Sequence, residues 1–211
     1  MDIVKTFILI FFTCLLCSCD LKTGDKKRTD LIPNPEKFEH DNYSSEDVKF
    51  IPDSSINGIS LHSDSLVISL LGDDYEKSIN SNADIPYLLV FNTKTNQLLT
   101  LYQHPGGVKG EFAELEVSGF KEYDKRHAIQ ISDKEFVTES GIRLNMTVGD
   151  LKSIKGEPDT IIVKETTTLV YKLDKIDKSS FLERHNMPIY FADYEFKDGY
   201  LIRFKFGFEY P

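Results

Sequence analysis

Residues 189–210 read IYFADYEFKDGYLIRFKFGFEY and form the clearest hairpin pattern in the sequence. Apolar and aromatic residues alternate with polar ones on both sides of Asp198 and Gly199, and a period of two is typical of β-strands. The pattern predicts an antiparallel hairpin with strands over 189–196 and 200–210.

The side chains of this hairpin also predict its register. A two-residue loop at Asp198 and Gly199 would place polar side chains opposite apolar ones. A three-residue loop, which also includes Lys197, pairs Phe196 with Tyr200 and makes one face of the hairpin consistently apolar. We therefore expect the longer loop, with Gly199 in a left-handed bulge.

Upstream of the hairpin lies a repeated pattern. Residues 141–159 read GIRLNMTVGDLKSIKGEPD, and a weaker copy, GISLHSDSLVISLLGD, occupies 58–73. Each copy predicts a short helix, because Ser63 or Thr147 can cap the first turn and a glycine can end the last one. The glycines that end the two helices are Gly72 and Gly156. The side chains expected on their buried faces are Val67, Leu70, Leu151 and Ile154.

Segments with strand character follow each predicted helix. After the first helix they lie at 87–91, 98–102, 113–120 and 128–132. After the second helix they lie at 160–164 and 167–173, before the hairpin. Each half of the chain thus predicts a helix followed by antiparallel strands.

The stretch 141–159 resembles the opening of BamE-like (SmpA/OmlA) domains. In that family a glycine-containing stretch ending in Met and Ser or Thr leads into a short helix that ends L-G-x-P, and antiparallel strands follow. Here Met146, Thr147, Gly156 and Pro158 carry the likeness. The resemblance implies a small helical layer on an antiparallel sheet, and two such units in tandem would resemble the beta-lactamase-inhibitor-protein arrangement. It is a resemblance of fold, so it transfers no binding residue.

The expected fold class is therefore α+β, with two related units that each pack short helices on an antiparallel sheet. The first unit is expected at 51–135 and the second, BamE-like, unit at 136–211. Residues 19–50 are polar and contain Pro33 and Pro35, which is typical of an extended tether.

The start of the chain carries the strongest signal of cellular location. Phe7 to Leu16 form an apolar run that suits a signal peptide and is too short to span roughly 30 Å of hydrocarbon. Leu16 to Cys19 read LCSC and resemble the lipobox of bacterial lipoproteins. The resemblance implies that 1–18 are removed and that Cys19 carries a diacylglyceryl group and a further acyl chain such as palmitate. The alternatives are an uncleaved anchor and a plain secretory signal with an unrelated cysteine.

Composition excludes several classes of protein. The 211 residues carry a net charge of −9, so the surface repels nucleic-acid phosphates. All cysteines, Cys14, Cys17 and Cys19, precede the folded part, which therefore has no disulfide and no thiol chemistry.

No catalytic residue, cofactor motif or metal-ligand pattern emerges from the sequence, since the histidines are scattered without paired spacing. The most glycine-rich stretch, HPGGVKGE at 104–111, predicts a loop between strands. A more specific interpretation is that this exposed loop contacts a partner through His104, Gly106, Gly107, Lys109 and Gly110.

Two acidic residues near the C-terminus allow two interpretations. Asp193 and Glu195 alternate on a predicted strand and could form a carboxylate pair. The interpretation that we prefer places them on an outer polar face beside Arg203 and Lys205.

These observations favour a non-enzymatic lipoprotein of the bacterial cell envelope that binds another protein or supports an assembly. It would be held at a membrane, the outer rather than the inner, through the lipid on Cys19, with its folded part periplasmic or surface-exposed. The alternative is an envelope enzyme or a binder of glycan or cell-wall material.

Overall fold

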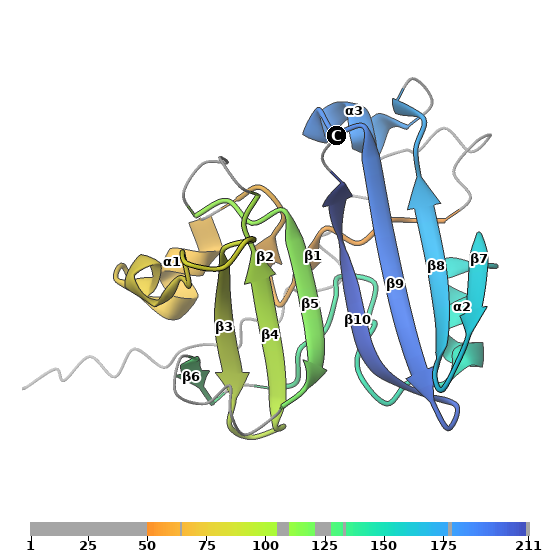
Figure 1. The fold of residues 1–211 in the computed structure, drawn as a ribbon, viewed down its shortest axis with the longest axis horizontal. Coiled ribbons are helices and arrows are strands. Elements are labelled where there is room, and N and C mark those ends of the chain that lie inside the picture. The colour runs from red at the N-terminus through yellow and green to blue at the C-terminus, as the bar shows by residue number, and fades with distance from the viewer. Residues whose placement is uncertain are drawn as a thin grey trace, which may run out of the picture. The chain divides into compact units, whose positions relative to one another are not determined.

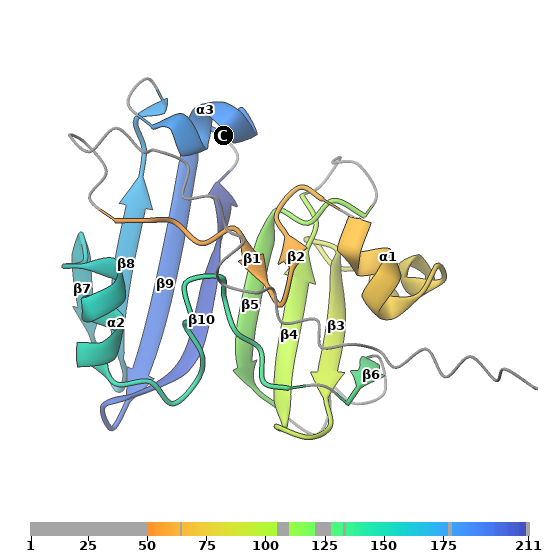
Figure 2. The same ribbon diagram turned by 180° about the vertical axis from the view of Figure 1, so that it is seen from behind.

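The computed structural model describes residues 50–63, 65–104, 110–120, 128–132, 134–176 and 179–209. All of them belong to one compact unit, Leu31–Pro211. Figures 1 and 2 show this part of the chain from opposite sides.

One eight-stranded sheet dominates the structure, in the order β6-β3-β4-β5-β10-β9-β8-β7 (Figure 1). Its strands are β3 (Tyr87–Asn92), β4 (Gln97–Tyr102), β5 (Glu114–Gly119), β6 (Ile129–Ile131), β7 (Thr160–Val163), β8 (Thr167–Leu173), β9 (Ile189–Lys197) and β10 (Tyr200–Glu209). Only the short β6 is parallel to its neighbour, β3. A separate two-stranded sheet joins β1 (Ser55–Ile56) to β2 (Ile59–Ser60).

The expected fold class, two α+β units with a helical layer on each sheet, is wrong. The described helices are short: α1 (Ser65–Leu71), the 3-10 helix η2 (Tyr75–Ser78), α2 (Val148–Lys155) and α3 (Ser180–His185). The protein is mainly β, and β5 from the first half of the chain pairs with β10 from the second in one mixed sheet. In this pairing the amide and carbonyl groups of β5 and β10 hydrogen-bond to each other, whereas in two separate units they would lie at two exposed sheet edges.

The two helices that the repeat predicts are confirmed. In α2 the Thr147 hydroxyl accepts a hydrogen bond from the Asp150 amide at 3.2 Å, and the Asp150 carboxylate accepts one from the Thr147 amide at 3.1 Å. This reciprocal cap satisfies two otherwise unpaired amides of the first turn. The closing glycines have positive φ, 88° at Gly72 and 77° at Gly156.

The β9–β10 hairpin is confirmed, but its predicted register is wrong. Lys197 pairs with Tyr200, so the turn is the two-residue one, with Asp198 and Gly199 both at positive φ. The ladder then shifts between Leu201 and Arg203, where an extra residue forms a β-bulge. The bulge restores the match of apolar side chains that the two-residue turn alone would have broken.

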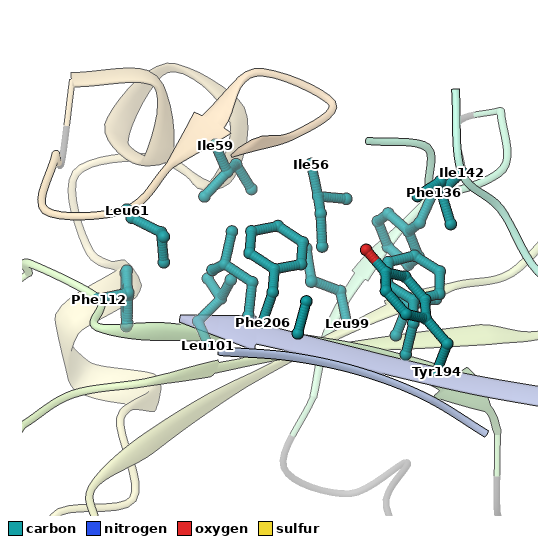
Figure 3. Packing of buried hydrophobic residues seen from close by; sticks show 14 of the residues in the cluster. Ile56, Ile59, Leu61, Leu99, Leu101, Phe112, Phe136, Ile142, Tyr194 and Phe206 are labelled. Carbon is teal, nitrogen blue, oxygen red and sulfur yellow. The ribbon is translucent and has the colours of Figure 1, made fainter. Parts of the chain in front are cut away.

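The main core lies on one face of the sheet. Figure 3 shows Leu99, Leu101, Phe206 and Tyr194 from the strands pointing toward Ile56, Ile59 and Leu61 from the β1–β2 region and toward Phe136 and Ile142. All these side chains are buried. In Figure 2 the segment from residue 50 through β1, the chain before α2, and α2 itself lie in front of the strands on this side.

Gly207 permits a close approach between β10 and β5. It lies opposite Glu114, and the next amide, that of Phe208, donates to the Ala113 carbonyl at 3.0 Å. A Cβ atom at position 207 would collide with that carbonyl oxygen and would lie 2.6 Å from the Glu114 Cα. Backbone atoms cannot yield as a flexible side chain can, so only glycine fits.

We therefore expect Gly207→Ala to lower the free energy of unfolding by about 1–3 kcal/mol, because the new methyl forces the two strands apart. Gly119→Ala in β5 is the matched control, since a Cβ there meets no atom within 4 Å. Urea unfolding of both variants tests this. Equal stability of the two would show that the backbones do not meet as described.

Candidate functional site

The residues predicted from the sequence as functional fall largely outside the described part of the chain. Cys19, Gly106, Gly107 and Lys109 lie outside it. Of the expected contact loop, His104 is half-buried, and Gly110 is buried with a φ of 89°. The carboxylates Asp193 and Glu195 lie on the sheet face opposite the main core, as the preferred interpretation predicted.

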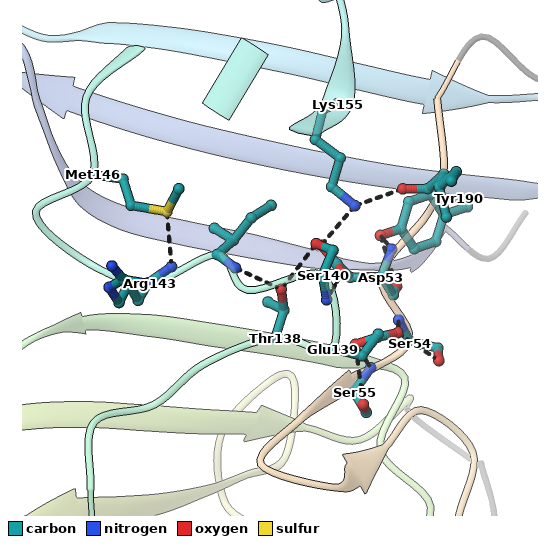
Figure 4. Close-up of polar contacts among 12 residues, drawn as sticks. Asp53, Ser54, Ser55, Thr138, Glu139, Ser140, Arg143, Met146, Lys155 and Tyr190 are labelled. Atoms are coloured by element: carbon teal, nitrogen blue, oxygen red, sulfur yellow. Dashed lines mark hydrogen bonds and ion pairs between the residues drawn. The ribbon is translucent and has the colours of Figure 1, made fainter. Parts of the chain in front are cut away.

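A different group of polar side chains lies on the face of the sheet that carries the main core. We call it the buried polar cluster: Asp53, Ser54, Ser55, Glu139, Ser140, Lys155 and Tyr190 (Figure 4). Its members come from the segment 50–56, which we call the strap, from the loop before α2, from the last residue of α2 and from β9. Residues far apart in the sequence therefore meet at one place.

An ion pair forms the centre of the cluster. The Lys155 ammonium lies 2.8 Å from Asp53 Oδ2, and each side chain is only 1% exposed. Lys155 also donates to the Ile51 carbonyl at 2.5 Å, and the Ser140 amide donates to Asp53 Oδ1 at 3.3 Å. Oδ2 accepts no well-directed hydrogen bond within the described residues, so the charge of Lys155 is what compensates it.

Two tyrosines of β9 flank the pair in different ways. The Tyr190 hydroxyl accepts from the Asp53 amide at 3.1 Å and donates to the Asp53 carbonyl at 2.8 Å. The buried Tyr194 hydroxyl has no hydrogen-bond partner among the described residues. Burial, and then the nearby Asp53 carboxylate, raise the pKa of Tyr194 well above its usual range.

Glu139 fixes the strap from the other side. Its carboxylate accepts from the Ser54 hydroxyl at 2.9 Å, from the Ser55 amide at 2.9 Å and from the Ser55 hydroxyl at 3.0 Å, and the Ser54 amide also donates to it. Burial, and then the charge of Asp53, raise the pKa of Glu139 above its ordinary value. Two carboxylates therefore share one buried site with a single lysine.

The cluster is closed to an external substrate, because its central side chains are almost fully buried. Its visible effect is to hold the strap against α2 and β9. No motif in the sequence identified the buried polar cluster. The only related feature of the sequence is a lysine in the last turn of a capped helix, a position where the helix dipole favours positive charge.

Two histidine rings pack against aromatic side chains at one end of the main core. His185 of α3 lies 4.7 Å from the Phe181 ring and 5.0 Å from the Phe208 ring, centroid to centroid. The His62 ring lies 4.9 Å from Phe208 and 6.2 Å from His185. Burial, and then His62 and Arg184, lower the pKa of His185 to about 4.

Within the described ranges, no set of three or more His, Cys, Asp or Glu side chains is arranged to bind a metal ion. In that same part of the chain, no helix has the length and apolar character needed to cross a membrane. Comparison of the chain with protein-family models, with curated proteins and with solved structures gives no match.

The two tyrosines provide a matched test of the buried polar cluster. Tyr190→Phe leaves the buried amide and carbonyl of Asp53 without a partner, and should lower the free energy of unfolding by about 1–3 kcal/mol. Tyr194→Phe removes a hydroxyl that has no partner, so it should leave stability unchanged or raise it. Urea unfolding compares them, and the opposite order would contradict the described hydrogen bonds.

His185 should make stability depend on pH. Its pKa is lower in the folded protein than in the unfolded chain, so the unfolded state binds more protons between about pH 6.5 and pH 4. Its contribution is therefore complete above this window and is lost as the pH falls through it. His185→Phe keeps the ring contacts and should reduce the loss of stability measured by urea unfolding across the window. An unchanged pH profile would contradict the burial of this ring.

Proposed function

We propose that this chain is a bacterial envelope lipoprotein, held at the outer membrane through lipid on Cys19, whose folded part binds another protein. The lipobox-like sequence at 16–19 supports the anchor. The binding role is supported by the charged and aromatic side chains on the sheet face opposite the main core, which we call the open face.

The open face is made of paired charges beside aromatic rings. Lys205 lies 2.5 Å from Glu114, and Arg203 lies 3.0 Å from Glu116, in ion pairs between β10 and β5. The Lys205 ammonium also lies 4.5 Å from the centre of the Tyr102 ring. These side chains are partly exposed, and in Figure 1, which views this side of the sheet, α2 lies behind β7 and β8 and α1 lies beside β3, so neither helix covers the central strands.

Such a surface suits recognition of a protein. Charges held in fixed positions by neighbours select a partner of complementary pattern and reject like charges. Aromatic rings next to these charged side chains supply contact area and lose little side-chain entropy on binding. The apolar cluster of Leu89, Phe91 and Leu98 lies on the same side of the sheet over β3 and β4, but these side chains are buried and form a second small core, so the binding surface is the charged and aromatic part over β5, β9 and β10.

The anchor and the binding face can be tested in one experiment in the native bacterium. Tagged full-length chain is expressed with a fatty-acid probe, and the envelope is crosslinked, solubilised and captured on the tag. We expect Cys19→Ala to abolish labelling and to release the protein from membranes. Continued labelling of this variant would contradict lipidation at Cys19.

The same capture tests the open face with a charge swap. The double variant Glu114→Lys with Lys205→Glu keeps the ion pair but reverses its orientation, so it should lose the partner that the unmodified chain recovers. The control swap Asp74→Lys with Lys77→Asp exchanges a well-exposed pair at η2 and should retain that partner. Equal recovery with both swaps, or no partner with any chain, would refute a binding role for the open face.

A further inference from the structure

The Lys155–Asp53 pair has the geometry of two groups poised to react with each other. The amine nitrogen lies 2.8 Å from Oδ2, which is one bond away from the carboxyl carbon that the amine would attack, and each side chain is only 1% exposed. Intramolecular groups held in such contact react as though at very high concentration, with effective molarities of about 10⁵–10⁸ M. A buried ammonium and carboxylate can also exchange a proton, which yields the nucleophilic amine and the electrophilic acid.

We propose that Lys155 and Asp53 condense to form an intramolecular amide, an isopeptide bond between the two side chains. Lys155 Nζ adds to Asp53 Cγ, the bond from Cγ to Oδ2 breaks, and Oδ2 leaves as water with two of the three ammonium protons. The third proton remains on the amide nitrogen. Since the starting pair is neutral overall, charge balances, and the step needs no oxidant, reductant or cofactor.

The surroundings of the pair fit each stage of this reaction. The Ser140 amide donates to Oδ1, the oxygen that carries negative charge when the amine adds. Oδ2, the oxygen that leaves, is buried and accepts no well-directed hydrogen bond within the described residues. The exclusion of bulk water from the site opposes hydrolysis of the product.

The product would also keep its polar partners. The Ile51 carbonyl, 2.5 Å from Lys155 Nζ, can accept from the new amide N–H, and the Ser140 amide can still donate to the remaining oxygen. A neutral amide removes two charges from a site where both are desolvated. Glu139, whose pKa is raised by burial and by Asp53, stays bound to the serines of the strap.

The bond would join the strap covalently to the end of α2. The strap is where the described chain begins, directly after the proposed tether, so tension from a membrane anchor reaches it first. A covalent link at Asp53 would pass this tension to α2 and bypass the chain between the two residues. Formation of the bond requires only the buried pair, whether or not Cys19 is lipidated.

Peptide mass spectrometry of the full-length protein tests the proposal. After denaturation, trypsin should release the peptide Phe50–Lys77 joined to the peptide Ser153–Lys164, because trypsin does not cleave after a lysine whose amine is acylated. The branched species should weigh one water less than the two peptides together. Fragmentation should place the link at Asp53 and Lys155.

Two variants make the result specific. Lys155→Arg keeps the length and charge of the side chain but lacks the nucleophilic amine, and Asp53→Ala lacks the carboxyl group, so both should yield only linear peptides. A loss of water elsewhere, such as cyclisation of another Asp, would persist in both variants. Recovery of only linear peptides from unmodified protein that is folded by circular dichroism, including peptides cleaved after Lys155, would overturn the proposal and leave an ion pair only.

Discussion

The pairing of β5 with β10 joins the two halves of the chain and makes a single core possible. It turns the strands of both halves of the chain into one sheet, so that the hydrophobic core can continue across the seam from Leu115 and Val117 to Phe204 and Phe206. The approach is close enough to require glycine at position 207. Without the seam, each half would expose an unpaired edge strand and one side of its core.

The buried polar cluster fastens the strap to the same core by different means. Burying Asp53 and Lys155 costs several kcal/mol per ion, and their mutual attraction with the added hydrogen bonds offsets that cost. Tyr190, Glu139 and Ser140 satisfy most of the remaining polar atoms of the strap. Because these partners come from separate elements, the cluster forms only when the second half of the chain has folded around the strap.

Local structure could be predicted from the sequence to a large extent. Closing glycines located α1 and α2, the Thr147 cap marked the start of α2, and period-two alternation located the strands β3 to β10, because these signals act within a few residues. The short helix α3 and the β1–β2 pair carry weaker local signals and were not predicted. The hairpin register failed because a bulge at Ile202 is decided by packing across the sheet.

What the sequence could not provide was the long-range arrangement. Nothing in the residues of β5 marks β10 as its neighbour, and nothing in Asp53 or Lys155 marks them as a pair, because both contacts join residues about a hundred positions apart. Two related copies suggested two units, whereas the fold joins their strands in one sheet. The proposed role at the membrane comes from the sequence of the first residues, whereas the open face is defined by ion pairs between strands that only the structure shows.

Both halves of the chain fold as one sheet through the β5–β10 seam, and native-state amide hydrogen exchange measures whether this seam opens separately from the rest of the sheet. We expect the amides of β5 and β10 to exchange only by global unfolding, with the same opening free energy as those of β4 and β9. Faster exchange along the seam, with the strands on either side still protected, would instead show two halves that separate independently and do not form one cooperative sheet.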